Sequence, residues 1–401
     1  MKSIELFAGA GGLALGGSIS GLKHSAVLEW DSHSCNALRH NIARPNWEFD
    51  KWDVLERDVR SYDFTQHAGQ VDIVSGGPPC QPFSVGGKHR AYNDARDMFP
   101  QASRAVAEIA PKAFIFENVR GLARESFKNY FQYITLRLTF PEETIRPNEE
   151  WKDHLARLER LYTSGGCYGL RYRVLTQVLN AANFGIPQQR HRVFIVGFRS
   201  DIQNEWNFPT ETHSEDALIV DKWVEKTYWD EHEIALKDRP KITDYEERKL
   251  SRMVIPLRRR WQTVRDAIDG LPDPSSNDST KISGHKFQPG AKPYPGHTGS
   301  QLDFPSKALK AGDHGVPGGE NMLALPNGMY RYYTIRESAR IQTFPDTYEF
   351  PASWTESMRQ LGNAVPVKLA SVVISSVKKA LSNGSKGSSS PKGYNGLQPS
   401  R

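Results

Sequence analysis

The segment IELFAGAGG (residues 4–12) contains an apolar run followed by a glycine-rich turn, the pattern that most clearly indicates the fold. Residues 4–8 form a short, mostly apolar run typical of a buried strand, and Gly9, Gly11 and Gly12 follow it at once. Glycines at such a point allow a sharp turn into a helix and let a ligand approach the free amides of the helix N-terminus. The spacing differs from the G-x-G-x-x-G of dinucleotide sites, so the turn alone is compatible with a ligand site or a purely structural turn.

Outward from this segment, short apolar runs alternate with helical patterns. Strands are predicted at 26–30, 71–75, 113–117, 172–179 and 192–198, and helices at 32–43, 102–109, 335–342 and 360–381. This alternation predicts an α/β fold with a doubly wound, mostly parallel sheet. Ligands of such sheets bind at the carboxyl ends of the strands, so the residues that follow each strand are the first candidates for a site.

The composition along the chain predicts two domains. Residues 1–199 hold the strand and helix pattern, whereas residues 200–333 are rich in aromatic residues, proline and glycine and predict a smaller, irregular domain. Residues 334–381 return to helical patterns and are assigned to the first domain. Residues 382–401 contain no acidic residue and many Gly and Ser, which is typical of a disordered tail. A helical pattern at 151–162 predicts an amphipathic surface helix without chemistry.

Overall charge and cysteine content limit the possible functions. The 401 residues carry a formal charge of +6 and a pI near 9.0, which favours a polyanionic partner without identifying one. Cys35, Cys80 and Cys167 are too few and too scattered for a disulfide framework or a zinc cluster, so we expect no metal and a reducing, cytoplasmic location. No apolar run approaches the roughly 20 residues of a spanning helix, so we expect no membrane contact.

An acidic and an aromatic residue end the second predicted strand. Glu29 stands where doubly wound folds bind ribose hydroxyls, and the indole of Trp30 can stack on an adenine. These residue types favour an adenosine-type ligand. Asp58 is a candidate to accept a hydrogen bond from the adenine amino group; Asp53 is the alternative, and either carboxylate could instead be a solvated surface group.

A proline-rich loop follows the predicted strand 71–75. Its sequence, GGPPCQPFS (76–84), excludes a helix or a central strand because proline lacks an amide donor. Cys80 is therefore held at the carboxyl end of a strand, where amides or a cation can lower the thiol pKa from its usual value of about 8.5 and create a nucleophile. Cys35 and Cys167 are interpreted as small buried hydrophobic residues.

The strand 113–117 ends in an acid. Because Glu117 stands at the end of an apolar run, we expect burial to raise its pKa. The carboxyl group can then act as a proton donor toward the cleft that Cys80 faces. A helix cap or a salt bridge would explain Glu117 taken alone. Neither would explain why it shares an edge of the sheet with Cys80.

The segment QQRHR (188–192) leads into the last predicted strand of the sheet. If it is extended, Gln188, Arg190 and Arg192 lie on one face. A single arginine at a sheet edge is usually solvated. Two on the same side, aimed at the cleft of Cys80, indicate a phosphate or a carbonyl that needs a fixed cation.

Together these motifs resemble the cytosine-5 DNA methyltransferase family, over nearly the whole chain and in the family's order. The matching blocks are ELFAGAGG (5–12), Glu29-Trp30, GPPCQPFS (77–84), ENV (117–119), QQRHR (188–192), RESARIQTFPD (336–346) and QLGNAVPV (360–367). The resemblance implies the fold of S-adenosylmethionine (SAM)-dependent methyltransferases, with a target-recognition domain at 200–333. Two positions depart from the pattern: Ala364 stands where some members have serine, and Phe99 where a leucine-type cofactor contact is usual.

The resemblance also implies roles for individual residues. Cys80 is the nucleophile toward cytosine C6, and Glu117 contacts the N3 and amino edge of the base. Arg192 holds the O2 carbonyl, while Arg190 and Gln188 steady the catalytic region. The residues implied to line the SAM site are Phe7, Gly9, Gly11, Glu29, Trp30, Asp58, Asn363 and Val365.

The implied reaction requires double-stranded DNA with the target cytosine flipped out of the helix, because C6 is reached only from above or below the base. The segment with Gly86, Lys88 and Arg90 has the glycines and cations to close over DNA, or it is an ordinary flexible loop. Candidate phosphate or guanine contacts in the smaller domain are Arg258, Arg259, Arg260, Lys286 and Lys307. The arginine triplet could equally form a solvated face.

The expected biology is a prokaryotic modification enzyme, since no large regulatory extension precedes the first motif. We expect a monomer that is paired functionally with a restriction endonuclease without binding it stably. A transfer-RNA enzyme of the same chemistry is the first alternative, but the Cys-Phe-Thr element of that branch is absent. The second is a DNA-binding regulator that has lost catalysis, although the nucleophile, the acid and the glycine turn are all present.

Overall fold

The computed structural model describes residues 1–79, 97–166, 169–203, 205–253, 257–312 and 321–384. Its centre is a seven-stranded sheet with the strand order β3-β2-β1-β4-β5-β8-β6. The strands are β1 (Lys2–Leu6), β2 (Lys23–Glu29), β3 (Val54–Glu56), β4 (Ile73–Gly76), β5 (Ala113–Val119), β6 (Tyr172–Asn180) and β8 (His191–Arg199). From β3 to β5 all neighbours are parallel, whereas β8 is antiparallel to β5 and β6. The predicted doubly wound, mostly parallel sheet is confirmed.

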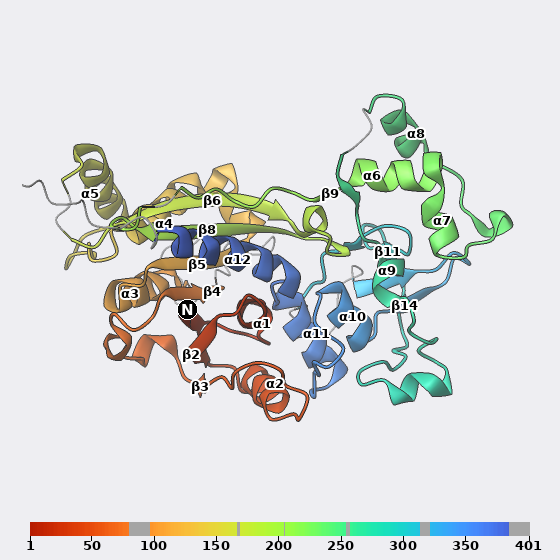
Figure 1. Cartoon of the computed structure of the whole chain (residues 1–401), viewed down its shortest axis with the longest axis horizontal. Coiled ribbons are helices and arrows are strands. Elements are labelled where there is room, and N and C mark those ends of the chain that lie inside the picture. The colour runs from red at the N-terminus through yellow and green to blue at the C-terminus, as the bar shows by residue number, and fades with distance from the viewer. Residues whose placement is uncertain (80–96, 167–168, 204, 254–256, 313–320, 385–401) are drawn as a thin grey trace, which may run out of the picture.

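Helices cover both faces of this sheet (Figure 1). They are α1 (Gly12–Ile19), α2 (Ser32–Ile42), α3 (Phe99–Ile109), α4 (Lys128–Thr139), α5 (Trp151–Ser164), α10 (Ile335–Ile341), α11 (Trp354–Asn363) and α12 (Val367–Gly384). Strand residues alternate between the faces, so Val74 packs in the cluster that contains α3 and α4, and Ile73 in the cluster that contains α12. The central strands are buried on both sides, as expected of a parallel sheet.

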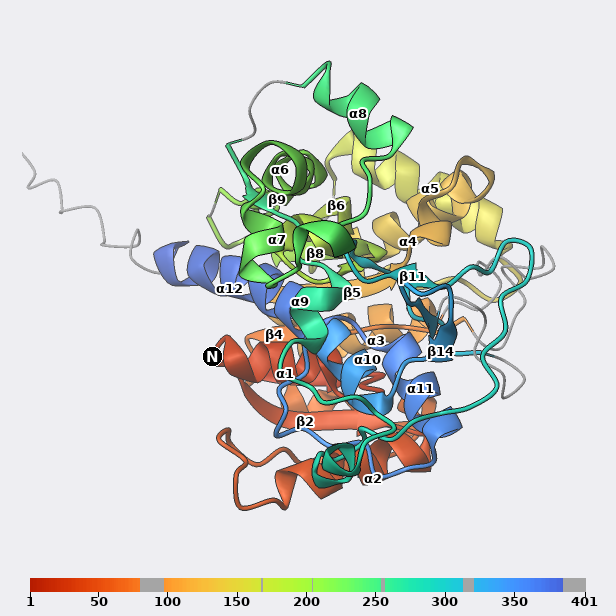
Figure 2. The ribbon, with the colours of Figure 1, turned by 90° about the vertical axis from the view of Figure 1, so that its right-hand side faces the viewer.

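Helices α1 and α12 lie side by side and run in the same direction (Figure 2). Glycine makes this close packing possible: a Cβ on Gly16 would lie 2.5 Å from the Cβ of Ala370. The C-terminal segment is therefore part of the first domain's core, which agrees with its predicted return.

The predicted single helix at 360–381 was wrong. The structure has two helices, α11 and α12, separated at Ala364–Pro366. Proline disfavours helical backbone in the residue before it, and Ala364 already has an extended conformation with ψ of 146°. Helix α12 then continues to Gly384, two residues beyond Ser382, where the predicted tail begins. Residues 385–401 lie outside the described part of the chain.

The segment predicted as a smaller domain lies beside the sheet and has only short elements (Figure 1). They are β9 (His213–Ser214), α6 (Glu215–Val220), α7 (Thr227–Glu231), α8 (Asp244–Leu250), β10 (Arg259–Arg260), α9 (Val264–Ile268), β11 (Ser300–Gln301), β12 (Ser306–Lys307), β13 (Met322–Ala324) and β14 (Tyr330–Tyr332). Strand β12 pairs with β7 (Gln188–Gln189), which connects this lobe to the chain that enters β8. The domain boundaries at 199/200 and 333/334 stay a prediction.

Candidate active site

The glycine turn after β1 has positive backbone φ angles, and at Gly9 it borders open space. Phe7, Gly9 and Gly11 have positive φ values of 56°, 53° and 83°. For phenylalanine this left-handed conformation costs roughly 1–2 kcal/mol, and such strain is concentrated at functional sites. A Cβ on Gly9 would meet nothing within 4 Å, whereas one on Gly12 would lie 2.3 Å from the carbonyl oxygen of Val365. Gly9 thus leaves room for a ligand, and Gly12 admits the returning segment.

Glu29 organises this turn from the end of β2. Its Oε2 accepts a hydrogen bond from Gly9 N at 2.7 Å, and its Oε1 accepts from Trp30 N and Asp31 N, both at 2.9 Å. Burial raises the pKa of Glu29, against the lowering effect of these three amides. A carboxylate oxygen can accept two hydrogen bonds, so Oε2 still has one position for a ligand hydroxyl. Trp30 is 71% exposed, so its indole face is available for stacking.

Asp58, rather than Asp53, lies at the edge of the sheet that holds Glu29. Asp58 follows β3, and Glu56 at the end of β3 pairs with Glu29, whereas Asp53 precedes β3 at its amino end. The Asp58 carboxylate binds the Arg60 guanidinium, with Arg60 Nε 2.9 Å from Oδ2, and this hydrogen bond lowers its pKa. Asp58 is thus an ionised acceptor that already has one cationic partner.

The residues proposed from the C-terminal segment differ in exposure. Asn363, the last residue of α11, is exposed. Val365 is only 6% exposed and packs in the core beneath the sheet, so its backbone, not its side chain, faces the glycine turn. Phe99, at the departure from the family pattern, is 3% exposed and belongs to the opposite core cluster.

Cys80 lies outside the described residues, as do Gly86, Lys88, Arg90 and Cys167. The chain that leads to Cys80 is anchored to β5. Asn118 Nδ2 donates to the carbonyl oxygen of Pro78 at 2.8 Å. A Cβ on Gly77 would lie 3.4 Å from Glu117 Oε2. The carboxyl group of Glu117 therefore lies beside Gly77, three residues before Cys80 in the sequence.

Glu117 forms a buried ion pair with Arg192. Arg192 Nε lies 2.8 Å from Glu117 Oε1, and the two side chains are only 13% and 8% exposed. Their strands are neighbours, because Val119 of β5 pairs with Arg192 of β8. Burial raises the pKa of Glu117, as expected from its position, and Arg192 and Arg190 oppose this effect. A cation and a carboxyl group with a raised pKa are thus held together at the edge of the sheet.

Arg190 has a different environment from Arg192. It is fully buried, and its Nη1 donates to the carbonyl oxygen of Leu309 at 2.9 Å. Its Nη2 donates to the carbonyl oxygens of Gly362 and Ala364 at 2.6 and 3.0 Å. Gln188 accepts a hydrogen bond from Leu309 N at 3.0 Å. Arg190 and Gln188 therefore join the smaller lobe to the C-terminal segment.

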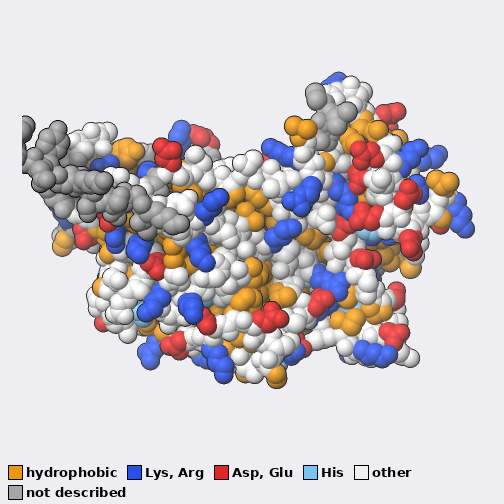
Figure 3. Space-filling view, in the orientation of Figure 1, with side chains coloured by type: hydrophobic (Ala, Val, Ile, Leu, Met, Phe, Trp, Pro, Cys, Tyr) orange, Lys and Arg blue, Asp and Glu red, His pale blue; other side chains and the backbone are white. Residues whose placement is uncertain are grey.

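The three arginines considered for DNA contact have three different environments. Arg260 is 13% exposed and is bound by Asp221, Glu231 and Asp266 at 2.8–2.9 Å. Arg258 pairs with Glu211 at 2.6 Å. Arg259 is exposed, and among the described residues no carboxylate pairs with it. Acidic side chains gather over α6 and α7 (Figure 3), so that part of the lobe is poorly suited to a polyanion.

The family was established by comparison with known sequences. The model of the C-5 cytosine-specific DNA methylase family matches residues 1–140 and 158–379. The chain belongs to this family. It is a DNA cytosine-5-methyltransferase, and its methyl donor is SAM. The interval 141–157, outside the matched blocks, includes the start of α5.

Similar sequences and structures support this assignment over most of the chain. The type II methyltransferase M.PspPI of Psychrobacter sp. is 32% identical over 92% of this chain and 76% of its own length. M.NgoMIV of Neisseria gonorrhoeae is 30% identical over 94% of this chain and 97% of its own. A prophage-encoded DNA modification methyltransferase of E. coli has a TM-score of 0.58 at 21% identity and covers 95% of this chain and 99% of its own. Because its identity is only 21%, the similarity to the E. coli structure supports the fold alone.

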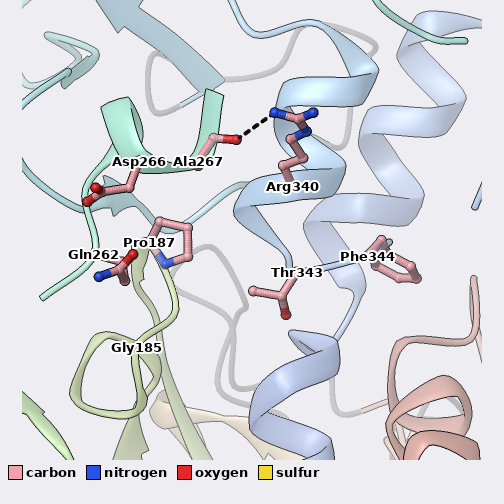
Figure 4. Close-up of a pocket in the computed structure, with 8 residues that line it drawn as sticks. All are labelled: Gly185, Pro187, Gln262, Asp266, Ala267, Arg340, Thr343 and Phe344. Atoms are coloured by element: carbon pink, nitrogen blue, oxygen red, sulfur yellow. Dashed lines mark hydrogen bonds between the residues drawn. The ribbon is translucent and has the colours of Figure 1, made fainter. Parts of the chain in front are cut away.

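Two hollows of this methylase open at the junction of its lobes. One, of about 330 Å³, is lined by residues from α9 and α10, with Arg340 donating to the Ala267 carbonyl oxygen (Figure 4). The other, of about 560 Å³, is lined by the arginine triplet and Lys368. Neither contains a predicted cofactor or catalytic residue. The described residues include no helix able to span a membrane and no metal-binding cluster of His, Cys, Asp or Glu.

Sequence reasoning missed three residues of this methylase that hold the site together. Asn118 anchors the loop before Cys80, although its place in the ENV block was a signal. Tyr348 Oη donates to the carbonyl oxygen of Ala10 at 2.8 Å and so fixes the glycine turn from the C-terminal segment. Arg359 binds Asp31 next to Trp30. These contacts join residues far apart in the chain, and the pattern around each gives no sign of its partner.

Proposed function

We propose that this methylase transfers the methyl group of SAM to C5 of a cytosine within a specific short double-stranded DNA sequence. The cytosine is flipped out and forms a covalent Cys80–C6 intermediate. The observation that carries the proposal is the buried Glu117–Arg192 pair beside the loop that leads to Cys80. An acid and a cation at this position match the two polar edges of cytosine, N3 and O2.

The residues at the glycine turn fit the adenosine part of SAM. Glu29 keeps an acceptor position for a ribose hydroxyl, Trp30 offers an exposed ring, and the space at Gly9 is open. The proposed SAM site consists of Phe7, Gly9, Gly11, Glu29, Trp30, Asp58, Asn363 and Val365, the last through its main chain. When bound, SAM supplies the electrophilic methyl group.

The protein residues make C5 reactive. The thiolate of Cys80 forms a bond to C6, and the electron pair of the C5–C6 double bond moves into the ring toward N3. Glu117, which burial favours in its protonated form, donates a hydrogen bond or its proton to N3, and Arg192 stabilises O2. C5 forms the new bond to the methyl group as the bond between that group and the sulfonium sulfur breaks, and C5 then loses its proton to a base. The C5–C6 double bond returns as N3 gives any proton it received back to Glu117 and the Cys80–C6 bond breaks, and the thiolate leaves.

Target selection is assigned to the smaller lobe, 200–333. Its chain has no acidic residue between Asp278 and Asp303, and Lys286 and Lys292 in this interval are exposed. Phosphate contacts from such lysines and from Arg259 would position the duplex. Lys307 donates to Thr298 Oγ1 at 3.0 Å within the same lobe.

We further propose that the enzyme is a cytoplasmic monomer and the modification partner of a restriction endonuclease that it does not bind stably. A monomer suffices because each strand of a short site can be methylated in turn. The type II methyltransferases among its relatives support the functional pairing with a restriction endonuclease.

The test uses the purified full chain, methyl-labelled SAM, and either unmethylated genomic DNA or transfer RNA, with Cys80→Ala in parallel. Label in DNA as 5-methylcytosine, lost in the variant, supports the proposal, and conversion sequencing gives the target sequence. Label only in RNA would overturn the DNA assignment in favour of an RNA enzyme. Equal label from Cys80→Ala would overturn the covalent mechanism.

A further inference from the structure

An ion pair joins the end of β2 to helix α11. Arg359 Nη2 donates to Asp31 Oδ1 at 3.0 Å, across 328 residues of sequence. The same guanidinium binds Glu356 through Nε and Nη2, both at 2.7 Å, which holds the arginine in one orientation. Asp31 Oδ1 also caps α2 by accepting from Ser34 N at 2.8 Å. Asp31 is thus a fixed point to which α11 is attached.

The ion pair lies between two residues of the proposed SAM site. Asp31 directly follows Trp30, whose side chain is 71% exposed. Arg359 and Asn363 are four residues apart in α11, so they lie on the same face of the helix. The face that contacts Asp31 therefore also carries the exposed amide of Asn363.

We infer that Arg359 is a positioning residue for SAM. It acts through Asp31, by fixing Asn363 of α11 relative to Trp30, the residue that directly follows β2. The inference rests on the proposed SAM site. Holding the two sides in place before binding removes an ordering cost from the association, so the pair increases affinity without contacting the ligand.

The exposure of the ion pair separates this role from one in general stability. The side chains of Arg359 and Asp31 are 35% and 28% exposed, and ion pairs this accessible contribute little to folding. Burial raises the pKa of Asp31, whereas the hydrogen bonds from Ser34 and Arg359 lower it. The net shift of the Asp31 pKa is downward. Asp31 is therefore ionised wherever the enzyme is assayed, and the pair persists.

The experiment measures SAM binding by calorimetry for the full-length wild type, Asp31→Asn, Arg359→Gln and the double variant. Asparagine caps helices as well as aspartate does, so Asp31→Asn removes the ion pair and keeps the cap of α2. Each single variant should raise the Kd for SAM by on the order of fivefold, and the double variant should be no weaker than either single, as expected for one shared interaction. The KM for SAM should rise while kcat, the KM for DNA and the unfolding midpoint stay unchanged.

Asp201→Asn is the control, because Asp201 forms a carboxylate–guanidinium pair with Arg199 at 2.8 Å after the far end of β8. It should leave the Kd for SAM unchanged. A wild-type Kd in both single variants, or losses that multiply in the double variant, would overturn the inference. Absence of SAM binding by the wild type would instead overturn the proposed site, so the two failures are distinguishable.

Discussion

The edge of the central sheet and the arginine triplet of the smaller lobe both concentrate charge, but they hold it differently. At the sheet edge, Glu29 and Glu117 are buried carboxyl groups with raised pKa values, and each lies toward the carboxyl end of a strand of the same sheet. In the smaller lobe, Arg260 is surrounded by three carboxylates, while its neighbour Arg259 has none among the described residues.

This difference shows that residue type predicts function only where the backbone fixes direction. A residue that follows a parallel strand is delivered to the carboxyl edge whatever its neighbours are. A run of three arginines in an irregular lobe is distributed by tertiary contacts, and one of the three becomes a structural residue. Three experiments test this contrast.

The largest effect is expected at the sheet edge. Glu117→Gln should lower kcat by about 10²–10³-fold because it removes the proton donor to N3. SAM affinity should be unchanged, since Glu117 is not part of the proposed SAM site. Methyl transfer to DNA under saturating substrates measures the first quantity and calorimetry the second. Glu108→Gln is the control, a surface glutamate of α3 paired with Arg104, and a kcat within a few-fold of wild type for Glu117→Gln would refute the proposed role.

Substitutions in the arginine triplet should give the next largest effect, on protein stability and DNA affinity instead of kcat. Arg260→Gln should destabilise the protein by roughly 3 kcal/mol because it leaves buried carboxylates without their cation. Arg259→Gln should change stability by less than about 0.5 kcal/mol and reduce DNA affinity and its salt dependence by about one phosphate contact. Urea unfolding and DNA titrations at several salt concentrations measure both. If the two variants behave alike, the proposed division between structural and DNA-facing arginines fails.

Glu5, a carboxyl group that has no cationic partner among the described residues, should give the smallest change from one measured pH to the next, because its contribution to stability varies gradually with pH. Burial raises the pKa of Glu5 to about 8, opposed by the hydroxyl of Ser75, which donates to it. The folded state therefore holds this proton more tightly than the unfolded state, so stability present below about pH 4.5 is lost as the pH rises toward 8. The loss is at most about 1.4 kcal/mol per pH unit.

Urea unfolding at several pH values between 5 and 9 tests this dependence. Glu5→Gln should reduce the slope, to which the buried Glu29 and Glu117 contribute with the same sign, while Glu108→Gln should retain it. His24, whose pKa is lowered to about 4 by burial, acts at lower pH and leaves the upper part of the range unaffected. Parallel profiles for the wild type and Glu5→Gln would contradict the assignment.

Local sequence patterns were sufficient to predict the sheet, its carboxyl edge and the acidic residues at that edge. Alternating strand and helix patterns are local, and a glycine turn or an apolar run ending in Glu117 has the same consequence in any parallel sheet. The raised pKa of Glu117 followed from the apolar residues that precede it in its strand, whereas the preference for Asp58 over Asp53 as a SAM-site residue stays a prediction.

The partners of these residues depend on the tertiary structure and could not be predicted from the sequence. It buried Arg190 against three carbonyl oxygens but placed Arg192 beside Glu117, although the two are separated by one residue. It also divided the predicted helix 360–381 and joined Arg359 to Asp31. Such outcomes depend on which distant segment occupies the adjacent space, and a local pattern contains no information about that segment.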